Sequence, residues 1–199
     1  MAALVHVVDD DPAVRDSLGF LLDSAGIGVR TYGSAAEFLA AVPTIRSGCV
    51  LTDVRMPDID GLALQRRLCA LGNRLPVIVM TGHGDVPIAV EALKTGAADF
   101  LEKPFDDEHL LRAVRDALQA SETDREKRGA TEAVRARLAT LTPREREVLD
   151  RLVDGLPNKT IAYDLGTSPR TIEVHRARVM EKMAARSLPD LVRMVLALD

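Results

Sequence analysis

The chain has 199 residues, of which 47% are hydrophobic and 28% charged, and its formal net charge at pH 7 is −4. This balance fits a soluble globular protein, and no apolar run approaches the ~18–20 residues of a membrane-spanning helix. The N-terminus lacks a charged segment followed by a cleavable apolar stretch, so no signal peptide is predicted and a cytoplasmic location is expected. Cys49 and Cys69 have no metal-ligand spacing and are predicted to be reduced structural thiols.

The charge is distributed unevenly along the chain. Residues 1–118 carry 11 Lys+Arg against 17 Asp+Glu, a net charge of −6, whereas residues 119–138 and 139–199 each carry +1. An acidic part joined to a mildly basic part indicates two partners of different kinds. Charge alone does not predict nucleic-acid binding here.

Short apolar runs alternate with helix-period segments through residues 1–118. Strands are predicted at 4–8, 27–32, 48–53, 76–80 and 98–102. Helices are predicted between and after them at 12–24, 34–41, 60–71, 85–95 and 106–120. Asp11-Pro12 and Ser34-Ala-Ala-Glu37 supply helix starts, with Asp11 read as a cap rather than a metal ligand. The alternation predicts a doubly wound, five-stranded parallel sheet, an α/β domain of flavodoxin-like type.

Residues 119–138 are predicted to be a helical linker. The segment is polar, alanine-rich and mixed in charge, and Gly129 is expected to break it. Two readings stay open. Either an apolar stripe of Val114, Leu118, Val134 and Leu138 lies between domains, or the segment is a solvated tether.

Residues 139–199 are predicted to form a second, smaller all-α domain of four short helices. Thr142-Pro143-Arg144-Glu145 is a capping box that opens the first, and the second runs from Asn158 to about Leu165 and stops at Gly166. Ser168-Pro169 opens the third, which runs to about Ala184, and Ser187 opens the fourth. Two short helices joined through a glycine-containing turn indicate a helix-turn-helix.

Acidic residues follow two of the predicted strands, and a threonine and a lysine follow two more. Asp9 and Asp10 follow the first strand and Asp53 ends the third, while Thr81 and Lys103 follow the fourth and fifth. Because the carboxyl ends of parallel strands form the ligand crevice, these side chains are expected to meet at one edge. Clustered carboxylates repel one another, and a bound divalent cation relieves that cost. The pattern predicts a magnesium-dependent phosphoryl site.

Asp53 is the predicted nucleophile, since it ends the central strand and a carboxylate that attacks a phosphoryl group gives a labile acyl phosphate. Asp9 and Asp10 would hold Mg²⁺, and the Arg55 carbonyl would add a ligand. Lys103 would pair with a phosphoryl oxygen, and the Thr81 hydroxyl would donate to one.

The third C-terminal helix has two faces at ~100° per residue. Ile172, Val179 and Met183 form the face expected to pack on the domain. The other face, expected to be exposed and suited to reading bases in a major groove, carries Thr171, Val174, His175, Arg178 and Lys182. The candidates for phosphate contacts are Lys159, Arg170, Arg176 and Lys182.

In its motifs the chain resembles two-component response regulators of the FixJ family. The receiver motifs are Val8-Asp-Asp-Asp11, Asp53-Val-Arg-Met-Pro57, Thr81-Gly-His-Gly-Asp85 and Lys103-Pro104-Phe105. The motifs that resemble a LuxR/NarL-type helix-turn-helix are Leu141-Thr-Pro-Arg-Glu-Arg146, Gly155-Leu-Pro-Asn-Lys159 and Ser168-Pro-Arg-Thr-Ile-Glu-Val-His175.

The resemblance implies a transcription regulator, not an enzyme, whose Asp53 is phosphorylated by a sensor histidine kinase in the presence of Mg²⁺. It also implies a switch pair of Thr81 and Phe100, a cis Lys103–Pro104 bond, and a homodimer after phosphorylation. Promoter DNA and RNA polymerase are the further partners expected. The dimer contacts implied for the fourth C-terminal helix are Leu188, Leu191, Val192 and Val195.

Two other functions are compatible with parts of this sequence. A phosphohydrolase of haloacid dehalogenase type would carry a D-x-D-G-T pattern, which Val8-Asp-Asp-Asp-Pro12 lacks. A DNA-binding module with a vestigial receiver would lack part of the acidic site, but the whole set is present. The sequence leaves open whether the unphosphorylated receiver masks the DNA-binding domain or fails to dimerise.

Overall fold

The computed structural model describes residues 4–82 and 86–198, so His83 to Asp85 of the Thr81–Asp85 motif lie outside the described residues. The chain divides into two compact units, residues 1–125 and 126–199. The predicted boundaries at 118 and 138 fall on either side of this division. Each unit has its own apolar core and is described by itself.

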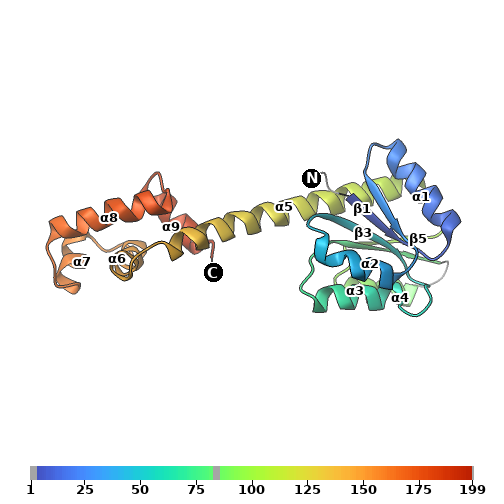
Figure 1. Cartoon of the computed structure of the whole chain (residues 1–199), viewed down its shortest axis with the longest axis horizontal. Helices are drawn as coiled ribbons and strands as arrows, with labels where there is room; N and C mark the ends of the chain where they lie inside the picture. The colour runs from blue at the N-terminus through green and yellow to red at the C-terminus, as the bar shows by residue number, and fades with distance from the viewer. Residues whose placement is uncertain (1–3, 83–85, 199) are drawn as a thin grey trace. The chain divides into compact units, whose positions relative to one another are not determined.

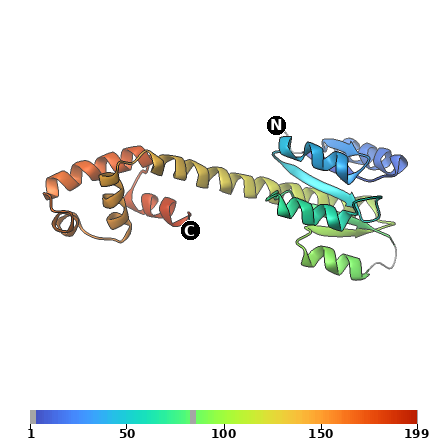
Figure 2. The ribbon, with the colours of Figure 1, turned by 60° about the horizontal axis from the view of Figure 1, so that its bottom comes forward.

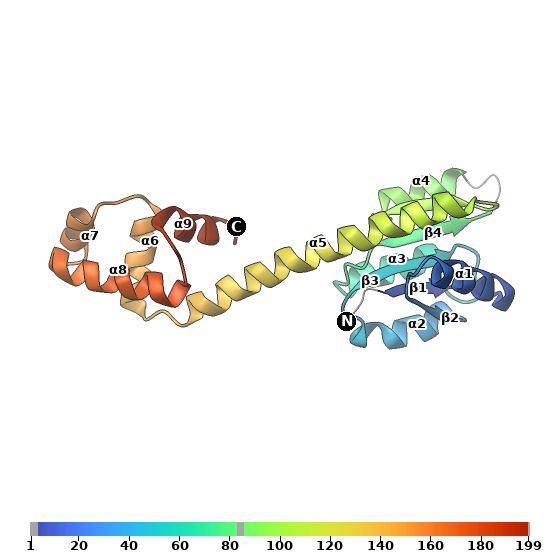
Figure 3. The ribbon, with the colours of Figure 1, turned by 90° about the horizontal axis from the view of Figure 1, so that it is seen from above.

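The first unit is built on a five-stranded parallel sheet with the order β2-β1-β3-β4-β5 (Figure 3). Its strands are β1 (Leu4–Val8), β2 (Val29–Tyr32), β3 (Gly48–Asp53), β4 (Val77–Thr81) and β5 (Asp99–Glu102). Of the three inner strands, β3 and β4 are buried along their whole length and β1 is buried from Val5 to Val8, as expected for strands covered on both faces. The predicted doubly wound parallel sheet is confirmed, with β2 two residues shorter than expected.

Helices cover both faces of this sheet (Figure 1). One face packs on α1 (Pro12–Ser24) and on the first turns of α5 (Asp107–Ala139). The other packs on α2 (Ala35–Ala41), α3 (Gly61–Ala70) and α4 (Val86–Lys94), and a short 3-10 turn (Val42–Thr44) follows α2. Two apolar layers therefore hold the sheet and fix the positions of the strand ends.

The predicted helix starts are present in the structure. The Asp11 side chain accepts a hydrogen bond from the Ala13 N–H at 2.8 Å, so Asp11 is the cap of α1. Ser34 caps α2 by accepting from the Glu37 N–H at 3.1 Å. Both loops lie at the carboxyl edge of the sheet, which is the edge that carries the acidic residues.

Helix α5 is continuous for 33 residues and passes through Gly129 without a break. The predicted break was wrong because one glycine in a helix costs only about 1 kcal/mol, and strong helix formers surround it. Val114 and Leu118 pack in the first unit, whereas Val134 and Leu138 pack in the second. Each pair serves the core of its own unit.

The second unit consists of the last turns of α5 and four short helices, drawn in orange and red in Figure 2. These are α6 (Pro143–Val153), α7 (Asn158–Asp164), α8 (Pro169–Met183) and α9 (Leu188–Leu196). The chain turns between α7 and α8 at Gly166, whose φ of 60° is accessible to glycine at no steric cost. The predicted all-α unit with a helix-turn-helix is confirmed. Within residues 4–82 and 86–198, no helix has both the length and the apolar character that crossing a membrane requires.

Candidate functional sites

The sheet register brings the predicted acidic residues together. Val8 on β1 lies beside Thr52 on β3, so Asp9 and Asp53 continue adjacent strands at the carboxyl edge. Lys103 follows β5 and reaches both: its Nζ lies 2.6 Å from Asp53 Oδ1 and 3.2 Å from Asp9 Oδ2. Residues 94 positions apart in the sequence thus form one ionic cluster.

Burial and charge act against each other in this cluster. Asp9 is 2% exposed, and burial raises the pKa of its carboxyl group, although the Asp11 N–H and Lys103 oppose the rise. For Lys103, burial lowers the pKa, but the hydrogen bonds and charges of Asp53 and Asp9 outweigh it and leave the pKa raised. Lys103 therefore stays an ammonium ion and compensates the paired carboxylates at neutral pH.

The Asp53 carboxylate is held at both oxygens. Oδ1 accepts from Lys103, and Oδ2 accepts from the Arg55 N–H at 2.6 Å. The Thr81 hydroxyl at the end of β4 is buried beside this cluster and contacts the Gly82 carbonyl at 3.5 Å, at the limit of a hydrogen bond. Phe100 on β5 is half-buried, and the Lys103–Pro104 bond is cis, as the resemblance implied.

The oxygen atoms at this edge of the sheet are of the kind that bind a magnesium ion. Mg²⁺ prefers oxygen ligands and binds through one or two carboxylates, with water and phosphate oxygens completing the shell. Asp9 and Asp53 supply two carboxylates, Asp10 is an exposed third on the same loop, and the Arg55 carbonyl stays the predicted backbone ligand. No group of three His, Cys, Asp or Glu side chains in the described ranges converges as a complete cage. The residues therefore fit an open Mg²⁺ site that water and phosphate oxygens complete, and they do not fit a closed structural site.

Two residues at this edge were missed by the sequence reasoning. Gly61 begins α3 so close to the chain at β3 that a Cβ on it would lie 2.3 Å from the Asp53 backbone oxygen. Arg15 donates from Nη1 to the Asp9 carbonyl at 2.7 Å and so holds the acidic loop from α1. The Asp60-Gly61 pair was a visible signal, but it reads as an ordinary helix start.

The exposed face of α8 carries most of the predicted base-reading residues. Thr171, Val174 and Arg178 are exposed, and His175 is half-buried. Ile172, Val179 and Met183 are fully buried in the core of the second unit, as predicted. The amphipathic assignment of α8 is confirmed.

The candidates for phosphate contacts lie in different surroundings. Lys159 on α7 and Arg170 on α8 are exposed. Arg176 is half-buried and donates to Asn158 Oδ1 at 3.3 Å, a bond that links α8 to α7. These three cations lie on the two helices of the helix-turn-helix.

Lys182 is placed differently from the prediction. Its Nζ pairs with Glu145 Oε2 at 2.6 Å and donates to the Thr140 carbonyl at 3.1 Å. Glu145 is 3% exposed, and its pKa is lowered to about 2 by the Lys182 hydrogen bond first and by the Thr142 backbone N–H second. Lys182 therefore stabilises a buried carboxylate of this unit, a role that its place in the sequence did not indicate.

Of the four predicted dimer contacts on α9, Leu191 needs correction. Leu191 is fully buried in the core of the second unit, and Leu188 and Val195 pack against that core. Leu191 therefore cannot contact a second copy unless its own core opens. Val192 is half-buried and Leu196 is 59% exposed, so the outward apolar side of α9 carries these two residues.

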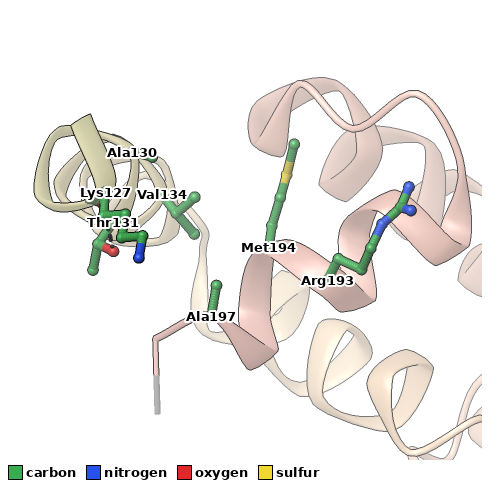
Figure 4. A pocket seen from close by; sticks show the side chains of 7 residues that line it. All are labelled: Lys127, Ala130, Thr131, Val134, Arg193, Met194 and Ala197. Carbon is green, nitrogen blue, oxygen red and sulfur yellow. Dashed lines mark hydrogen bonds between the residues drawn. The ribbon is translucent and has the colours of Figure 1, made fainter. Parts of the chain in front are cut away.

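The second unit also holds an apolar groove of about 490 Å³ between α5 and α9. Figure 4 shows Ala130, Thr131 and Val134 on one wall, with Met194 and Ala197 on the other. Lys127 and Arg193 complete the lining. None of the predicted DNA contacts lines this groove, so it is distinct from the exposed face of α8.

Comparisons with known proteins agree with both units. Residues 5–115 match the family described as the response regulator receiver domain, and residues 139–195 match the bacterial regulatory proteins of the luxR family. The chain is 60% identical to the transcriptional regulatory protein FixJ of Azorhizobium caulinodans, over 96% of this chain and 91% of that protein. It is 55% identical to FixJ of Rhizobium meliloti, over 97% of this chain and 95% of that protein.

Solved structures give the same result. The response regulator StyR matches with a TM-score of 0.90 and 40% identity, covering 98% of this chain and 99% of that one. Full-length FixJ from B. japonicum matches with a TM-score of 0.62 and 50% identity, covering 98% and 97%. The two FixJ relatives are named as transcriptional regulatory proteins. The chain belongs to the FixJ-type two-component response regulators, which join a receiver domain to a LuxR-type DNA-binding domain.

Proposed function

We propose that phosphorylation of Asp53 by a sensor histidine kinase switches the affinity of this regulator for promoter DNA. The observation that supports this most directly is the Lys103 ammonium, which lies 2.6 Å from Asp53 and 3.2 Å from Asp9 at the carboxyl edge of the sheet. A carboxylate there can take a phosphoryl group while a fixed cation stays beside the new negative charge.

In the proposed step, an Asp53 carboxylate oxygen bonds to phosphorus as the bond from phosphorus to the donor breaks. The Arg55 N–H orients the carboxylate through Oδ2, and Lys103 moves from Asp53 Oδ1 to a phosphoryl oxygen. Asp9, Asp10, Asp53 and the Arg55 carbonyl would hold Mg²⁺. When bound, that ion neutralises charge on the phosphoryl oxygens.

The proposed signal leaves the site through Thr81 and Phe100. The Thr81 hydroxyl would turn toward a phosphoryl oxygen, because a charged acceptor makes a stronger hydrogen bond than a neutral carbonyl such as that of Gly82. Movement of Thr81 frees space into which the half-buried Phe100 ring can turn. The surface around β4 and β5 would then change shape and favour a receiver dimer.

The proposed output is DNA binding by α8. Arg178 would read a guanine and the Val174 methyl groups a thymine, with Thr171 and His175 beside them. Lys159, Arg170 and Arg176 would contact phosphates and set the position of the helix without reading sequence. A two-fold dimer would place two such helices on a two-fold related operator.

On α9 we propose Val192 with Leu196 as the contact between two copies, in place of the set that included the buried Leu191. The protein is proposed to act in the cytoplasm, where promoter DNA and RNA polymerase are available. Residues 119–138 belong to α5. We propose that they connect phosphorylation in the first unit to DNA binding by the second.

The test is to incubate the full chain with Mg²⁺ and a small-molecule phosphodonor, and to follow mass and oligomeric state together. The expected result is one added phosphoryl group, dimer formation and tighter operator binding, with Asp53→Asn showing none of them. Phosphorylation with tighter DNA binding but no dimer would favour unmasking within a monomer. An Asp53→Asn protein that binds like the phosphorylated wild type would refute the switch.

A further inference from the structure

A second pocket lies in the receiver unit at the amino-terminal side of the sheet, away from the edge that carries Asp53. It has a volume of about 220 Å³ and lies between β1, β2, the loop before β3 and α5. Its lining consists of Leu4, His6, Arg30, Thr44, Ile45, Arg46, Ser47 and Arg125. Because parallel strands place their carboxyl ends on the opposite edge, this pocket belongs to neither the phosphoacceptor site nor the DNA-binding helix.

The charged side chains that line this pocket are all positive, although residues 1–118 carry a net negative charge. Three arginines line it from three separate segments: Arg30 on β2, Arg46 in the loop and Arg125 on α5. None of the described lining residues is acidic, and within the described part of the chain none of the three guanidinium groups forms an ion pair. Converging like charges repel one another, and a bound anion removes that cost.

A buried polar atom supplies an independent sign of a ligand. His6 is 2% exposed, and its Nδ1 lies 3.1 Å from the Tyr32 hydroxyl. Its other ring nitrogen, Nε2, is buried and makes no hydrogen bond of normal geometry to any described group. Burial first and the Arg30 charge second lower the pKa of His6, and the nearby Ser47 backbone opposes them. A buried polar atom without a partner is uncommon and costly in a native fold.

The neutral form of His6 can donate a hydrogen bond to an anion, so the ring need not be protonated. Burial raises the pKa of Tyr32, although the charge and hydrogen bond of Arg30 oppose the rise, so the hydroxyl keeps its proton and can donate to His6 Nδ1. The neutral imidazole then carries its proton on Nε2, which is the nitrogen left to donate to a ligand. The rings of Tyr32 and Phe38 pack on His6 with centroids 5.8 and 5.7 Å away and fix its orientation.

We propose that this pocket binds a small multivalent oxyanion of phosphate chemistry, taken free from solution. Arg30, Arg46 and Arg125 would supply forked guanidinium donors, and His6 Nε2–H would donate from the floor of the pocket. Guanidinium groups match phosphate oxygens in pairs, which makes arginine clusters typical phosphate sites. The volume admits a phosphate or a small phosphate ester and excludes a protein segment.

The experiment titrates the full-length protein with inorganic pyrophosphate at constant ionic strength. EDTA is present so that the acidic site cannot take the ligand through a metal ion. Binding heat is measured together with the imidazole resonances of His6, which is one of only four histidines. Saturable binding with a matching shift of the His6 resonances is expected.

The Arg46→Gln/Arg125→Gln protein should bind pyrophosphate about tenfold more weakly or worse. Both side chains are exposed, so these changes leave the fold intact. The matched control is Arg112→Gln, which removes an exposed arginine from the same helix α5 and should not change the affinity.

Three results would overturn the proposal. One is the absence of a His6 shift at saturating pyrophosphate, and another is equal weakening in the Arg112→Gln control. The third is a His6 shift with a short DNA duplex but not with pyrophosphate, which would identify the anion as a nucleic-acid phosphate. Because the readout is local to His6, failure here leaves the proposed phosphorylation of Asp53 untouched.

Discussion

The replacement Lys182→Met tests whether this lysine stabilises the second unit or contacts DNA. Methionine keeps most of the aliphatic stem and removes the ammonium group that pairs with Glu145 at 2.6 Å. The Glu145 side chain is 4% exposed, so the change leaves a buried carboxylate with its Thr142 backbone bond and without its cation. We expect the second unit to lose stability.

The size of the loss follows from the pKa of Glu145, which falls from an ordinary 4.5 to about 2 in the folded chain. At about 1.4 kcal/mol per pH unit, all its partners together contribute about 3 kcal/mol at neutral pH. Lys182 is the largest contributor but shares the effect with the Thr142 N–H, and its side chain is 34% exposed. Solvent screening reduces its share to about 1–2 kcal/mol.

The same pair makes a prediction about pH with a definite sign. A carboxyl group with a lowered folded pKa contributes stability above its unfolded value, and that stability is lost as pH falls through the folded value. The contribution of Glu145 should therefore be complete above about pH 5 and disappear between 4.5 and about 2. A Glu145→Gln protein should lack this part of the acid sensitivity.

The assay is amide hydrogen exchange on the full chain, read in peptides from α6 and α8. Lys182→Met should lower their opening free energies by about 1–2 kcal/mol and leave the receiver peptides unchanged. A double-mutant cycle with Glu145→Gln isolates the coupling of the pair. The salt dependence of DNA binding should stay as in the wild type. If the exchange protection of α8 is unchanged and the salt dependence of DNA binding falls by about one released ion, Lys182 is a phosphate contact and the reasoning is refuted.

Three further predictions concern other residues. Gly61→Ala should slow phosphorylation about 10- to 100-fold, because the new Cβ would displace the chain at Asp53. Gly19→Ala, which adds a Cβ into open space, should leave the rate unchanged, and equal rates for the two variants would contradict the packing argument. Arg178→Ala should cost about 1–3 kcal/mol of operator affinity, whereas an equal loss on random DNA would reassign it to phosphate. Leu191→Ala should lower the free energy of unfolding of the second unit by about 2–5 kcal/mol, and Val192→Ala should lower it by much less. Thermal unfolding measures both, and equal losses would contradict the burial of Leu191 in the core.

Much of the fold could be predicted from the sequence because its signals are local. The strand at 48–53 is an apolar run with its acceptor at the end, and it forms β3 over those residues. Asp11, Ser34 and Thr142 each cap the helix that follows, as their positions predicted. Such signals depend on neighbours one to four residues away, so no tertiary information is needed to read them.

The meeting of Asp9, Asp53 and Lys103 was predicted by a rule of topology. In a parallel sheet with helical crossovers, all carboxyl ends lie on one edge, so the order of strands need not be known. That rule contains no distances, and the bridging position of Lys103 between the two carboxylates is seen only in the structure.

Only the tertiary structure decided what several side chains do. Lys182 and Leu191 have sequence positions that suit a DNA contact and a dimer contact, yet each is used within the second unit because α6 and its neighbours pack against them. The role of His6 likewise depends on Tyr32, 26 residues away, and the role of Gly61 depends on how the loop after β3 folds back on Asp53. Periodicity identifies which face of a helix is apolar or charged, but it carries no information about which partner reaches that face, since the partner is chosen by packing.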